Sequence, residues 1–240
     1  MSLPDKITLR AIDKKIAKQM IETHHYTHKF TSCRHALGIF YAEESKSDFF
    51  SSGENLVGCL IYGAPVGRLA IKSVSNDLEN NQVLELTRLF VYDEYPKNIE
   101  SCCIGKSFAW LKENDPEVEV LISYADPSQN HPGYIYQATN WIYQGNDRSV
   151  MERYAVSLTD DPYDWMHHRT VFETYGTVGM QELKRQIGKT FWIRIEPDKH
   201  RYVYLLRRRK YWIKRLNHPS LPYPKQQTFT EDIREVIHEG

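Results

Sequence analysis

The residues best suited to chemistry follow one short apolar run. Residues 118 to 122 predict a buried strand, and a turn rich in Pro, Ser and Gly comes directly after it. Open α/β folds bind ligands at the carboxyl ends of their strands, where loop residues converge. The crowding of polar groups there predicts a functional site rather than an ordinary surface turn. These groups are Ser123, Tyr124, Asp126, His131, Tyr134, Tyr136 and Asn140.

Asp126 is the principal candidate for catalysis in this segment. Its carboxylate can accept a proton from an attacking amine or ligate a metal, although an Asp before Pro127 also commonly forms a turn. Tyr136 follows on a predicted helix that can return its hydroxyl to the same centre; the alternative is a core tyrosine. Ser123 and the more distant Tyr26 complete the predicted catalytic set.

The surrounding elements must position this site, and their apolar patterns predict the order β–α–β–β–β–α–β–α followed by further strands. Asp13 is expected to cap the first helix, and the second and third strands are expected to pair antiparallel. Strands are predicted at 7–12, 36–42, 56–62, 83–91, 118–122, 151–157, 191–195 and 201–206. Helices are predicted at 14–25, 101–113, 133–143 and 180–188, with a polar connection at 43–55 and a partly helical tail from 225.

Length and composition predict an ordinary globular chain. It has 240 residues, of which 41% are hydrophobic and 26% charged, and no apolar run approaches the roughly 20 residues of a membrane span. Four cysteines without metal-site spacing, and the lack of an apolar leader, indicate a reduced, cytoplasmic protein without membrane contact. We expect a single domain over 1–240, with an insertion at 159–186 and a basic strand and tail at 199–240.

Positive charge is concentrated near the end of the chain. Residues 184–225 hold thirteen Lys or Arg and two acids, a net charge of +11, which leaves −11 for the rest of the neutral chain. Aromatic residues are interspersed among these cations, a composition that suits phosphate contact and base stacking. A solvated basic face is the alternative, and composition does not distinguish DNA from RNA.

Several long motifs, in the same order, carry a resemblance to a known family. The chain is similar to GNAT-type N-acyltransferases, and within them it resembles the bacteriophage Mom family of DNA-modification proteins over roughly residues 20–225. The motifs are HY at 25–26, LELTRLFV at 84–91 with Asn98 and Ser101 after it, SYADP at 123–127, HPGYIYQATNWIYQG at 131–145, HHRTVFETYGT at 167–177, KHRYVYLL at 199–206 and PYPK at 222–225.

This resemblance implies an α/β (α+β) GNAT-like fold, with a mixed, mostly antiparallel central sheet flanked by helices. It also implies transfer of a carbamoylmethyl, glycinamide-type group to adenine N6 in double-stranded phage DNA, which protects that DNA from host restriction. The donor would be an acyl or aminoacyl compound, acetyl-CoA or an aminoacyl-tRNA, bound at Arg88, Asn98 and Ser101. Fe(II) is a further implied cofactor.

One loop departs from the acetyltransferase pattern. A Gly-rich loop usually places its N–H groups around the CoA pyrophosphate at a helix N-terminus. The corresponding run here, YDEYPKNIES, has no glycine and carries Asp93, Glu94 and Glu100. Because these acids repel a pyrophosphate, conventional CoA binding is disfavoured and an aminoacyl-tRNA is an alternative donor.

Acting on paired adenine requires the base to be flipped into a pocket with stacking and edge-reading groups. Tyr124 and Asn140 are candidates for this role, and Tyr26 can stack. His25 with Asp126 can form an open His–carboxylate metal site. The predicted DNA-binding residues are Tyr124, Asn140, Arg169, Lys199, Arg201, Arg207, Arg208 and Arg209.

Two other functions are compatible with the same residues. A GNAT-type enzyme acting on tRNA or a small amine would use the same cleft, with the basic segment holding RNA. A non-catalytic nucleic-acid-binding protein would need only the basic segment, and the Ser123–Asp126–Tyr136 group argues against it.

Overall fold

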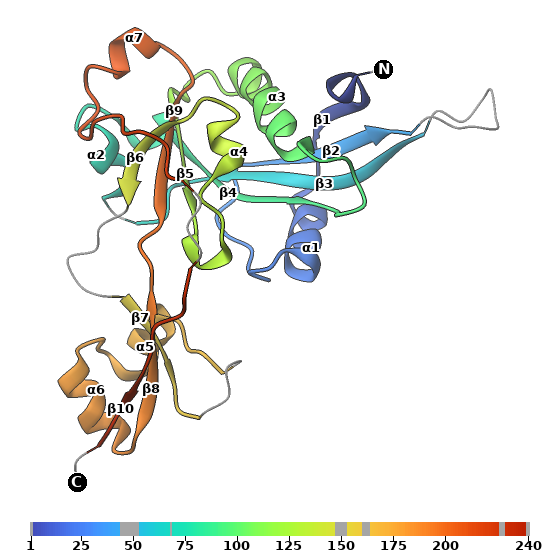
Figure 1. Ribbon diagram of the computed structural model, residues 1–240. Helices are drawn as coiled ribbons and strands as arrows, with labels where there is room; N and C mark the ends of the chain where they lie inside the picture. Colours follow the sequence, from blue (N-terminus) through green and yellow to red (C-terminus); the bar gives the residue numbers. More distant parts are fainter. Residues whose placement is uncertain are drawn as a thin grey trace. The chain divides into compact units, whose positions relative to one another are not determined.

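The computed structural model describes residues 2–43, 53–67, 69–146, 153–159, 164–225 and 229–238. The chain divides into two compact units, each built from several segments (Figure 1). The first unit comprises Met1–Tyr124, Gly133–Gly145 and Arg201–Tyr223, and the second comprises Ala125–Pro132, Asn146–His200 and Pro224–Gly240. The sequence predicted one domain with an insertion at 159–186, whereas that segment here belongs to a larger unit with its own sheet and core.

A seven-stranded sheet forms the first unit, in the order β1-β2-β3-β4-β5-β9-β6. The first four strands form an antiparallel meander, and β4 pairs with β5 in parallel. Its strands span Ile7–Ala11 (β1), His35–Ala42 (β2), Glu54–Gly63 (β3), Val83–Val91 (β4), Val120–Ala125 (β5), Ile142–Asn146 (β6) and His200–Leu205 (β9). Because strands with both faces covered need apolar residues on each, β3 and β4 are nearly continuous hydrophobic runs.

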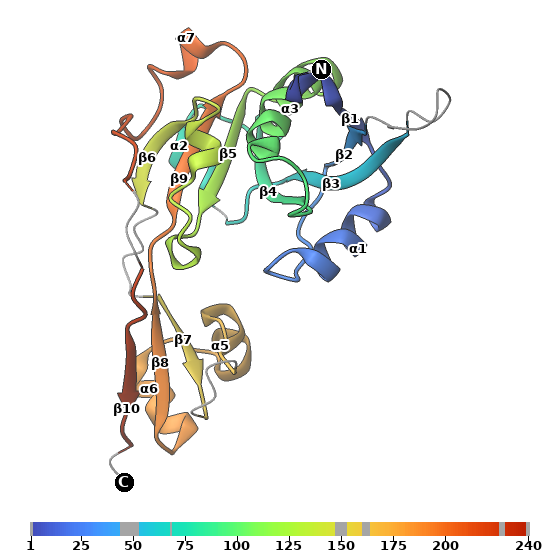
Figure 2. The ribbon, with the colours of Figure 1, turned by 45° about the vertical axis from the view of Figure 1, so that its right-hand side comes forward.

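Helices α1 (Lys14–His24) and α3 (Ile99–Asn114) lie on opposite faces of the β1–β4 part of the sheet (Figures 1 and 2). Asp13 caps α1 as predicted, because its side chain accepts a hydrogen bond from Lys15 N at 2.7 Å. Shorter helices complete the unit, namely η1 (Leu3–Lys6), α2 (Ala70–Val74), η2 (Asn80–Gln82), α4 (Tyr134–Gln137) and α7 (Arg209–Trp212).

The second unit has a three-stranded antiparallel sheet in the order β10-β8-β7 (Figure 2). The elements of this unit are η3 (Pro127–Gln129), β7 (Arg153–Ser157), α5 (His168–Tyr175), α6 (Met180–Ile187), β8 (Phe191–Glu196) and β10 (Ile233–Val236). Alternate residues of β8 (Phe191, Ile193 and Ile195) face a hydrophobic core, to which α5 contributes Val171 and α6 contributes Leu183.

The predicted fold class is confirmed, since the central sheet is mixed, mostly antiparallel and flanked by helices. Two element predictions are wrong. The helix expected over 133–143 ends at Gln137, because Asn140 adopts a positive φ of 60° and the chain then enters β6. The tail expected to be helical contains β10, which instead pairs with β8. The polar connection expected at 43–55 falls largely outside the described residues.

Among the residues that the structure describes, no helix combines the length and the apolar character that crossing a membrane requires.

Candidate active site

The site begins where β4 and β5 separate. The two strands pair only from Val83 to Glu85, opposite Val120 to Ile122, although β4 continues to Val91. Beyond the last pair, Ser123 Oγ lies 2.8 Å from the carbonyl oxygen of Leu86 and 2.7 Å from the hydroxyl oxygen of Tyr136. A serine hydroxyl has one proton and a carbonyl can only accept, so all three groups are satisfied when Tyr136 donates to Ser123 and Ser123 to Leu86.

Tyr136 lies in a buried aromatic environment. Its ring is 5.2 Å from that of Trp141 and 5.1 Å from that of Tyr202. Burial raises the pKa of Tyr136 to about 12, and the nearby Tyr26 and Glu85 act in the same direction, while the Ser123 hydrogen bond opposes them. The phenol therefore keeps its proton at neutral pH and can serve as a proton donor, although its oxygen can also accept a hydrogen bond.

Glu85 is a buried carboxylate near the start of β4, only 9% exposed. Its Oε2 accepts a hydrogen bond from Val66 N at 2.8 Å, and its charge acts on both Tyr136 and Arg88. The sequence analysis did not select Glu85. A charged residue inside the apolar run VLELTRLFV was the available signal, because buried acids are rare without a specific role.

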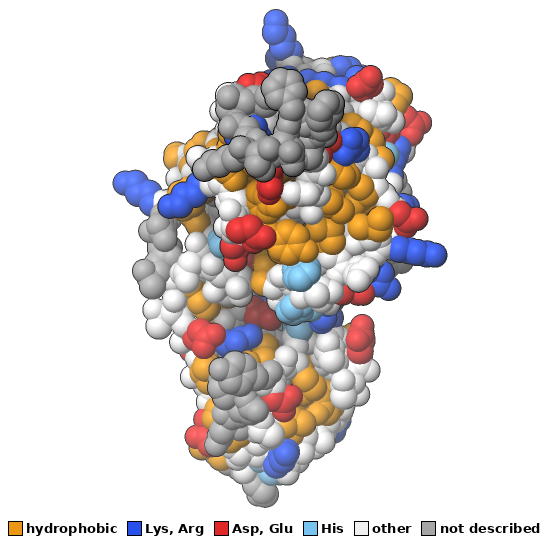
Figure 3. Space-filling model, turned by 90° about the vertical axis from the view of Figure 1, so that its right-hand side faces the viewer, with side chains coloured by type: hydrophobic (Ala, Val, Ile, Leu, Met, Phe, Trp, Pro, Cys, Tyr) orange, Lys and Arg blue, Asp and Glu red, His pale blue; other side chains and the backbone are white. Residues whose placement is uncertain are grey.

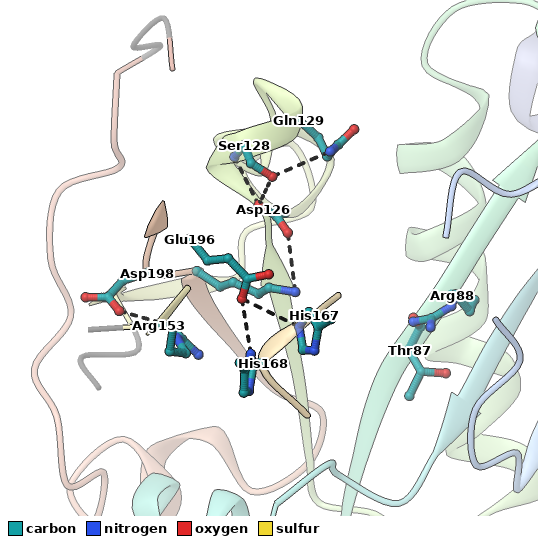
Figure 4. A network of polar contacts seen from close by, with 11 residues as sticks. Thr87, Arg88, Asp126, Ser128, Gln129, Arg153, His167, His168, Glu196 and Asp198 are labelled. Atoms are coloured by element: carbon teal, nitrogen blue, oxygen red, sulfur yellow. Dashed lines mark hydrogen bonds and ion pairs between the residues drawn. The ribbon is translucent and has the colours of Figure 1, made fainter. Parts of the chain in front are cut away.

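Arg88, predicted to bind the donor, lies three residues further along β4 and is half-buried. Its Nε donates to Lys29 O at 2.9 Å. Its Nη1 donates to the carbonyl oxygen of the neighbouring Thr87 at 2.6 Å, and Figure 4 shows these two residues. Burial lowers the pKa of Arg88, whereas the charges of Tyr26 and Glu85 raise it. The guanidinium nevertheless stays charged and places a fixed positive charge beside Glu85.

His25 and Tyr26 contribute a stacked pair of rings, with centroids 4.4 Å apart. His25 is buried, while Tyr26 is 57% exposed and therefore presents an aromatic surface. Burial, followed by the charge of Arg88, lowers the pKa of His25 to about 4. Its Nδ1 accepts a hydrogen bond from Thr27 N at 3.1 Å, so the neutral ring carries its proton on Nε2.

A groove of about 500 Å³ runs beside α3 and α4 in the same unit. Two predicted donor-binding residues, Asn98 and Ser101, line its end at the start of α3. Asn98 has a φ of 70°, so it supplies the left-handed conformation for which the expected loop would use a glycine. The groove has no charged residue in its lining, which consists of Leu3, Pro4, Asn98, Ser101, Cys102, Gly105, Phe108, Ala138, Thr139, Asn140 and Tyr204.

Asp126 belongs to the second unit, whereas Ser123 and Tyr136 belong to the first. Its Oδ1 accepts hydrogen bonds from Ser128 N at 3.0 Å and Ser128 Oγ at 2.6 Å, and its Oδ2 lies 3.3 Å from Lys199 Nζ (Figure 4). Asp126 thus caps η3 immediately before Pro127, the turn-forming role that the sequence offered as its alternative. Its catalytic role stays a prediction.

The predicted metal pair is also divided between the units, with His25 in the first and Asp126 in the second. At His25 only Nε2 could bind a metal, which would move the ring proton to Nδ1 and break the hydrogen bond from Thr27 N. Among the described residues, the one group of three metal-type ligands is His167, His168 and Glu196.

The protein-family comparison gives a match along nearly the whole chain. Residues 6–225 match the Mom protein family. The chain belongs to the Mom protein family.

A sequence relative is the methylcarbamoylase mom of Escherichia phage Mu, 26% identical over 232 residues, which cover 92% of this chain and 84% of that protein. Among solved structures, the chain is similar to spermidine N-acetyltransferase from Vibrio cholerae in complex with CoA and spermine. The TM-score is 0.41 at 9% sequence identity, and the match covers 84% of this chain and 96% of that one. Arabidopsis thaliana NAA60 in complex with acetyl-CoA has a TM-score of 0.43 and 11% identity, covering 83% and 99%.

In this Mom-family chain the predicted DNA-binding residues differ in their availability. Arg201 is 6% exposed, and its guanidinium binds Gln144 Oε1 at 2.7 Å and Ser73 Oγ at 2.8 Å. Its predicted phosphate contact does not fit this burial, because β9 turns the side chain into the core. Arg208 is half exposed and pairs with Glu119 at 2.9 Å, and Arg207 donates to the carbonyl oxygen of Lys112.

The other predicted DNA-binding residues differ in whether they are packed in the core, exposed or ion-paired. Tyr124 packs against the core cluster that contains Val120 and Ile122, whereas Asn140 lines the groove described above. Arg169 is exposed near the start of α5, and Lys199 pairs with Asp126. On the one face drawn in Figure 3, acidic and basic side chains are interspersed, so no continuous basic surface is visible there outside the grey residues.

Proposed function

We propose that this Mom-family protein is a transferase that attaches a methylcarbamoyl-type group to adenine N6 in double-stranded DNA. The observation that carries the proposal is the buried hydrogen bond between Ser123 and Tyr136 at the β4–β5 opening, with Glu85 and Tyr26 within electrostatic reach. The name of the phage Mu relative, a methylcarbamoylase, supports the type of group transferred. Protection of phage DNA from restriction enzymes is the biological role we propose.

The first step brings adenine out of the duplex. Extrusion of a base costs about a few kcal/mol and needs a stacking surface in the protein. Tyr26 supplies such a surface, because it is 57% exposed and already stacked on the buried His25. Tyr26 and Glu85 both act electrostatically on Tyr136 and on Arg88, so a base stacked on Tyr26 would lie near the proposed proton acceptor and donor.

In the transfer step, the N6 nitrogen attacks an electrophilic carbon of the donor and a C–N bond forms. Glu85 takes the proton that the amine loses, and the positive charge of Arg88 stabilises the carboxylate before the transfer. Tyr136 turns its O–H from Ser123 Oγ toward the leaving group and gives it the proton as the bond to the carrier breaks. Ser123 orients the phenol, since its hydroxyl is fixed at the other side by Leu86 O.

The donor we propose is an activated acyl compound. An uncharged part of the donor suits the groove beside α3, because the lining residues are neutral and include Phe108 and Tyr204. The loop before α3 exposes Asp93 and Glu94. Acetyl-CoA would give only an acetyl adduct, because its acyl group has no nitrogen, whereas an aminoacyl donor carries the nitrogen that a methylcarbamoyl- or glycinamide-type group needs; the two donors are therefore distinguished by the mass of the adduct.

The experiment incubates purified protein with duplex DNA and either donor, followed by nuclease digestion and mass spectrometry of the nucleosides. The proposal expects a modified deoxyadenosine with one donor and none without a donor. A matched reaction with tRNA in place of DNA tests the alternative acceptor. Modified nucleosides in tRNA alone would contradict DNA as the substrate, and no adduct with any acceptor would contradict the proposed transferase.

A further inference from the structure

The HHRTVFETYGT motif brings three ligand-type side chains together inside the second unit. His168 Nδ1 lies 3.1 Å from Glu196 Oε2, and His167 Nε2 lies 3.6 Å from the same oxygen (Figure 4). One ligand atom from each of the three residues lies within 4.8 Å of the others. The two imidazole rings are in contact, with centroids 4.0 Å apart.

Local backbone structure explains how adjacent histidines can face one carboxylate. His167 is the N-cap of α5 and has an extended backbone, with φ −61° and ψ 147°, whereas His168 is the first helical residue. This change of conformation between neighbours turns both side chains to the same side. Glu196 is the last residue of β8 and is held by the pairing of that strand with β7.

The separations match those of metal ligands. Zinc–nitrogen and zinc–oxygen bonds of about 2.0–2.2 Å at tetrahedral angles place ligand atoms about 3.3–3.6 Å apart. The two distances to Glu196 Oε2, 3.1 and 3.6 Å, lie close to this interval. The side chains are also accessible to an ion, being 43%, 29% and 22% exposed for His167, His168 and Glu196.

Nearby charges are largely paired, so the negative charge of Glu196 remains available. Lys199 is 3.3 Å from Asp126, and Arg153 is 3.0 Å from Asp198. Arg169 follows the two histidines and is exposed; its charge and that of Lys199 act on His167 in the opposite direction to the charge of Glu196.

We propose that His167, His168 and Glu196 form a binding site for a divalent first-row transition metal. Two imidazole nitrogens and one carboxylate oxygen suit Zn(II) or Fe(II) and disfavour Mg(II) and Ca(II), which prefer oxygen ligands. Three protein ligands leave at least one position open to water or a substrate group. The site lies within one unit and shares no residue with the His25–Asp126 pair that the sequence suggested.

Metal binding changes two local hydrogen bonds, because the bond between His168 Nδ1 and Glu196 Oε2 is replaced by coordination of both atoms. His167 Nδ1 accepts a hydrogen bond from Arg169 N at 3.3 Å, which puts the proton of the neutral ring on Nε2. A metal on Nε2 moves that proton to Nδ1, so the long cap bond is lost when the ion binds. His168 coordinates through Nδ1, the atom that already faces Glu196.

The test uses the full chain, freed of metal with a chelator, and titrates it with Zn(II) in a calorimeter. We expect one bound ion per chain, and we expect His168→Ala and Glu196→Gln to abolish this binding. Substitution of Co(II) should give the visible absorption bands of a tetrahedral or five-coordinate site in the wild type and not in the two cluster variants. His238→Ala in the same unit is the matched control and should bind normally.

A further measurement covers the case in which a variant fails to fold. Imidazole nitrogen NMR of the wild type should show shifts of two histidines on addition of one equivalent of Zn(II), assigned to His167 and His168. Zn(II) binding that persists in both His168→Ala and Glu196→Gln would overturn the site, as would NMR shifts confined to other histidines. In that case, loss of Zn(II) binding in His25→Ala would place the metal at His25. Absence of Zn(II) binding by the wild type would also overturn the proposed site, and the contact between His168 and Glu196 would then have a structural role only.

Discussion

The hydroxyl oxygen of Tyr136 lies 2.7 Å from Ser123 Oγ, and both side chains are buried where β4 and β5 separate. This hydrogen bond joins the end of one strand to the helix that follows it. It places a phenol that stays protonated at neutral pH beside the buried carboxylate of Glu85. A donor and an acceptor of protons are thus held together in one unit of the molecule.

Tyr136→Phe should reduce the rate of modification by at least about 10²-fold, the usual contribution of a general acid. Its stability should change little, because Ser123 can still donate to Leu86 O after the phenol is removed. Single-turnover rates and thermal unfolding measure the two effects. Tyr62→Phe is the control, because Tyr62 is also a buried tyrosine whose hydroxyl is bonded to a serine, Ser107 Oγ at 2.6 Å, and it should keep its rate. An unchanged rate in Tyr136→Phe would assign this tyrosine to the core alone.

Glu85→Gln should abolish modification while the protein remains folded, because the amide keeps an acceptor for Val66 N but cannot take a proton. Glu119 provides a matched control, since it is also 9% exposed and lies just before β5. Its carboxylate binds Trp212 Nε1 and Arg208 at 2.9 Å each. Glu119→Gln should therefore lower stability and leave the activity per folded molecule unchanged. Equal losses of activity in Glu85→Gln and Glu119→Gln would contradict a chemical role for Glu85.

The capping role of Asp126 and the role of its negative charge can be tested with two different substitutions. Asp126→Asn keeps an oxygen for Ser128 N but loses the ion pair with Lys199, whereas Asp126→Ala loses both. If Asp126 is catalytic, as the sequence predicted, both variants lose modification while only Ala is clearly less stable, by about 1 kcal/mol for a lost cap. Full activity in a folded Asp126→Asn protein would leave the residue with its capping role only.

His25 should make stability depend on pH. Its pKa is about 4 in the folded protein and about 6.5 in an unfolded chain, so the unfolded state binds more protons between these values. The free energy of unfolding therefore falls as the pH is lowered from about 6.5 to 4, by about 1–2 kcal/mol after screening. Urea unfolding at several pH values should show a weaker fall in His25→Gln than in the wild type. His238→Gln is the control, and identical pH profiles for His25→Gln and wild type would contradict the assignment.

The basic helix α7 should determine nucleic-acid affinity. Arg209, Lys210 and Lys214 make no ion pair in the part of the chain that the structure describes, unlike Arg208. Changing these three residues to Glu should weaken duplex binding and lower the slope of log K against log salt by about 0.9 for each lost phosphate contact. Fluorescence anisotropy at several salt concentrations measures this slope. The same change at Lys14, Lys15 and Lys18 is the control, and equal effects would indicate a general charge effect without a specific surface.

The sequence predicted the fold well wherever the hydrophobic period was clear. The run VLELTRLFV became β4 with the predicted ends, and Asp13 caps α1 as its position before an amphipathic helix indicated. The prediction of a helical tail was wrong because β10 forms by pairing with β8, a contact between segments that are far apart in the sequence. The helix over 133–143 was too long because the left-handed Asn140 ends it, and neither its apolar pattern nor its propensity indicates that turn.

The candidate site was predicted in part. Ser123 and Tyr136 were selected from sequence, and the structure brings their hydroxyls together. Glu85 was missed because its neighbours are apolar and only the folded sheet shows that it is buried beside Arg88. Arg201 was selected because it lies in the basic segment and in the motif KHRYVYLL, and its burial follows from the place of β9 inside the sheet, where Arg201, Tyr202 and Val203 are all buried.

The most direct test of the central claim is mass spectrometry of nucleosides from cells that carry a plasmid and express this protein. The account predicts a new deoxyadenosine adduct in plasmid DNA with the wild type, and none with folded Tyr136→Phe or Glu85→Gln. Unmodified deoxyadenosine with the wild type, or an adduct found in tRNA and absent from DNA, would contradict it.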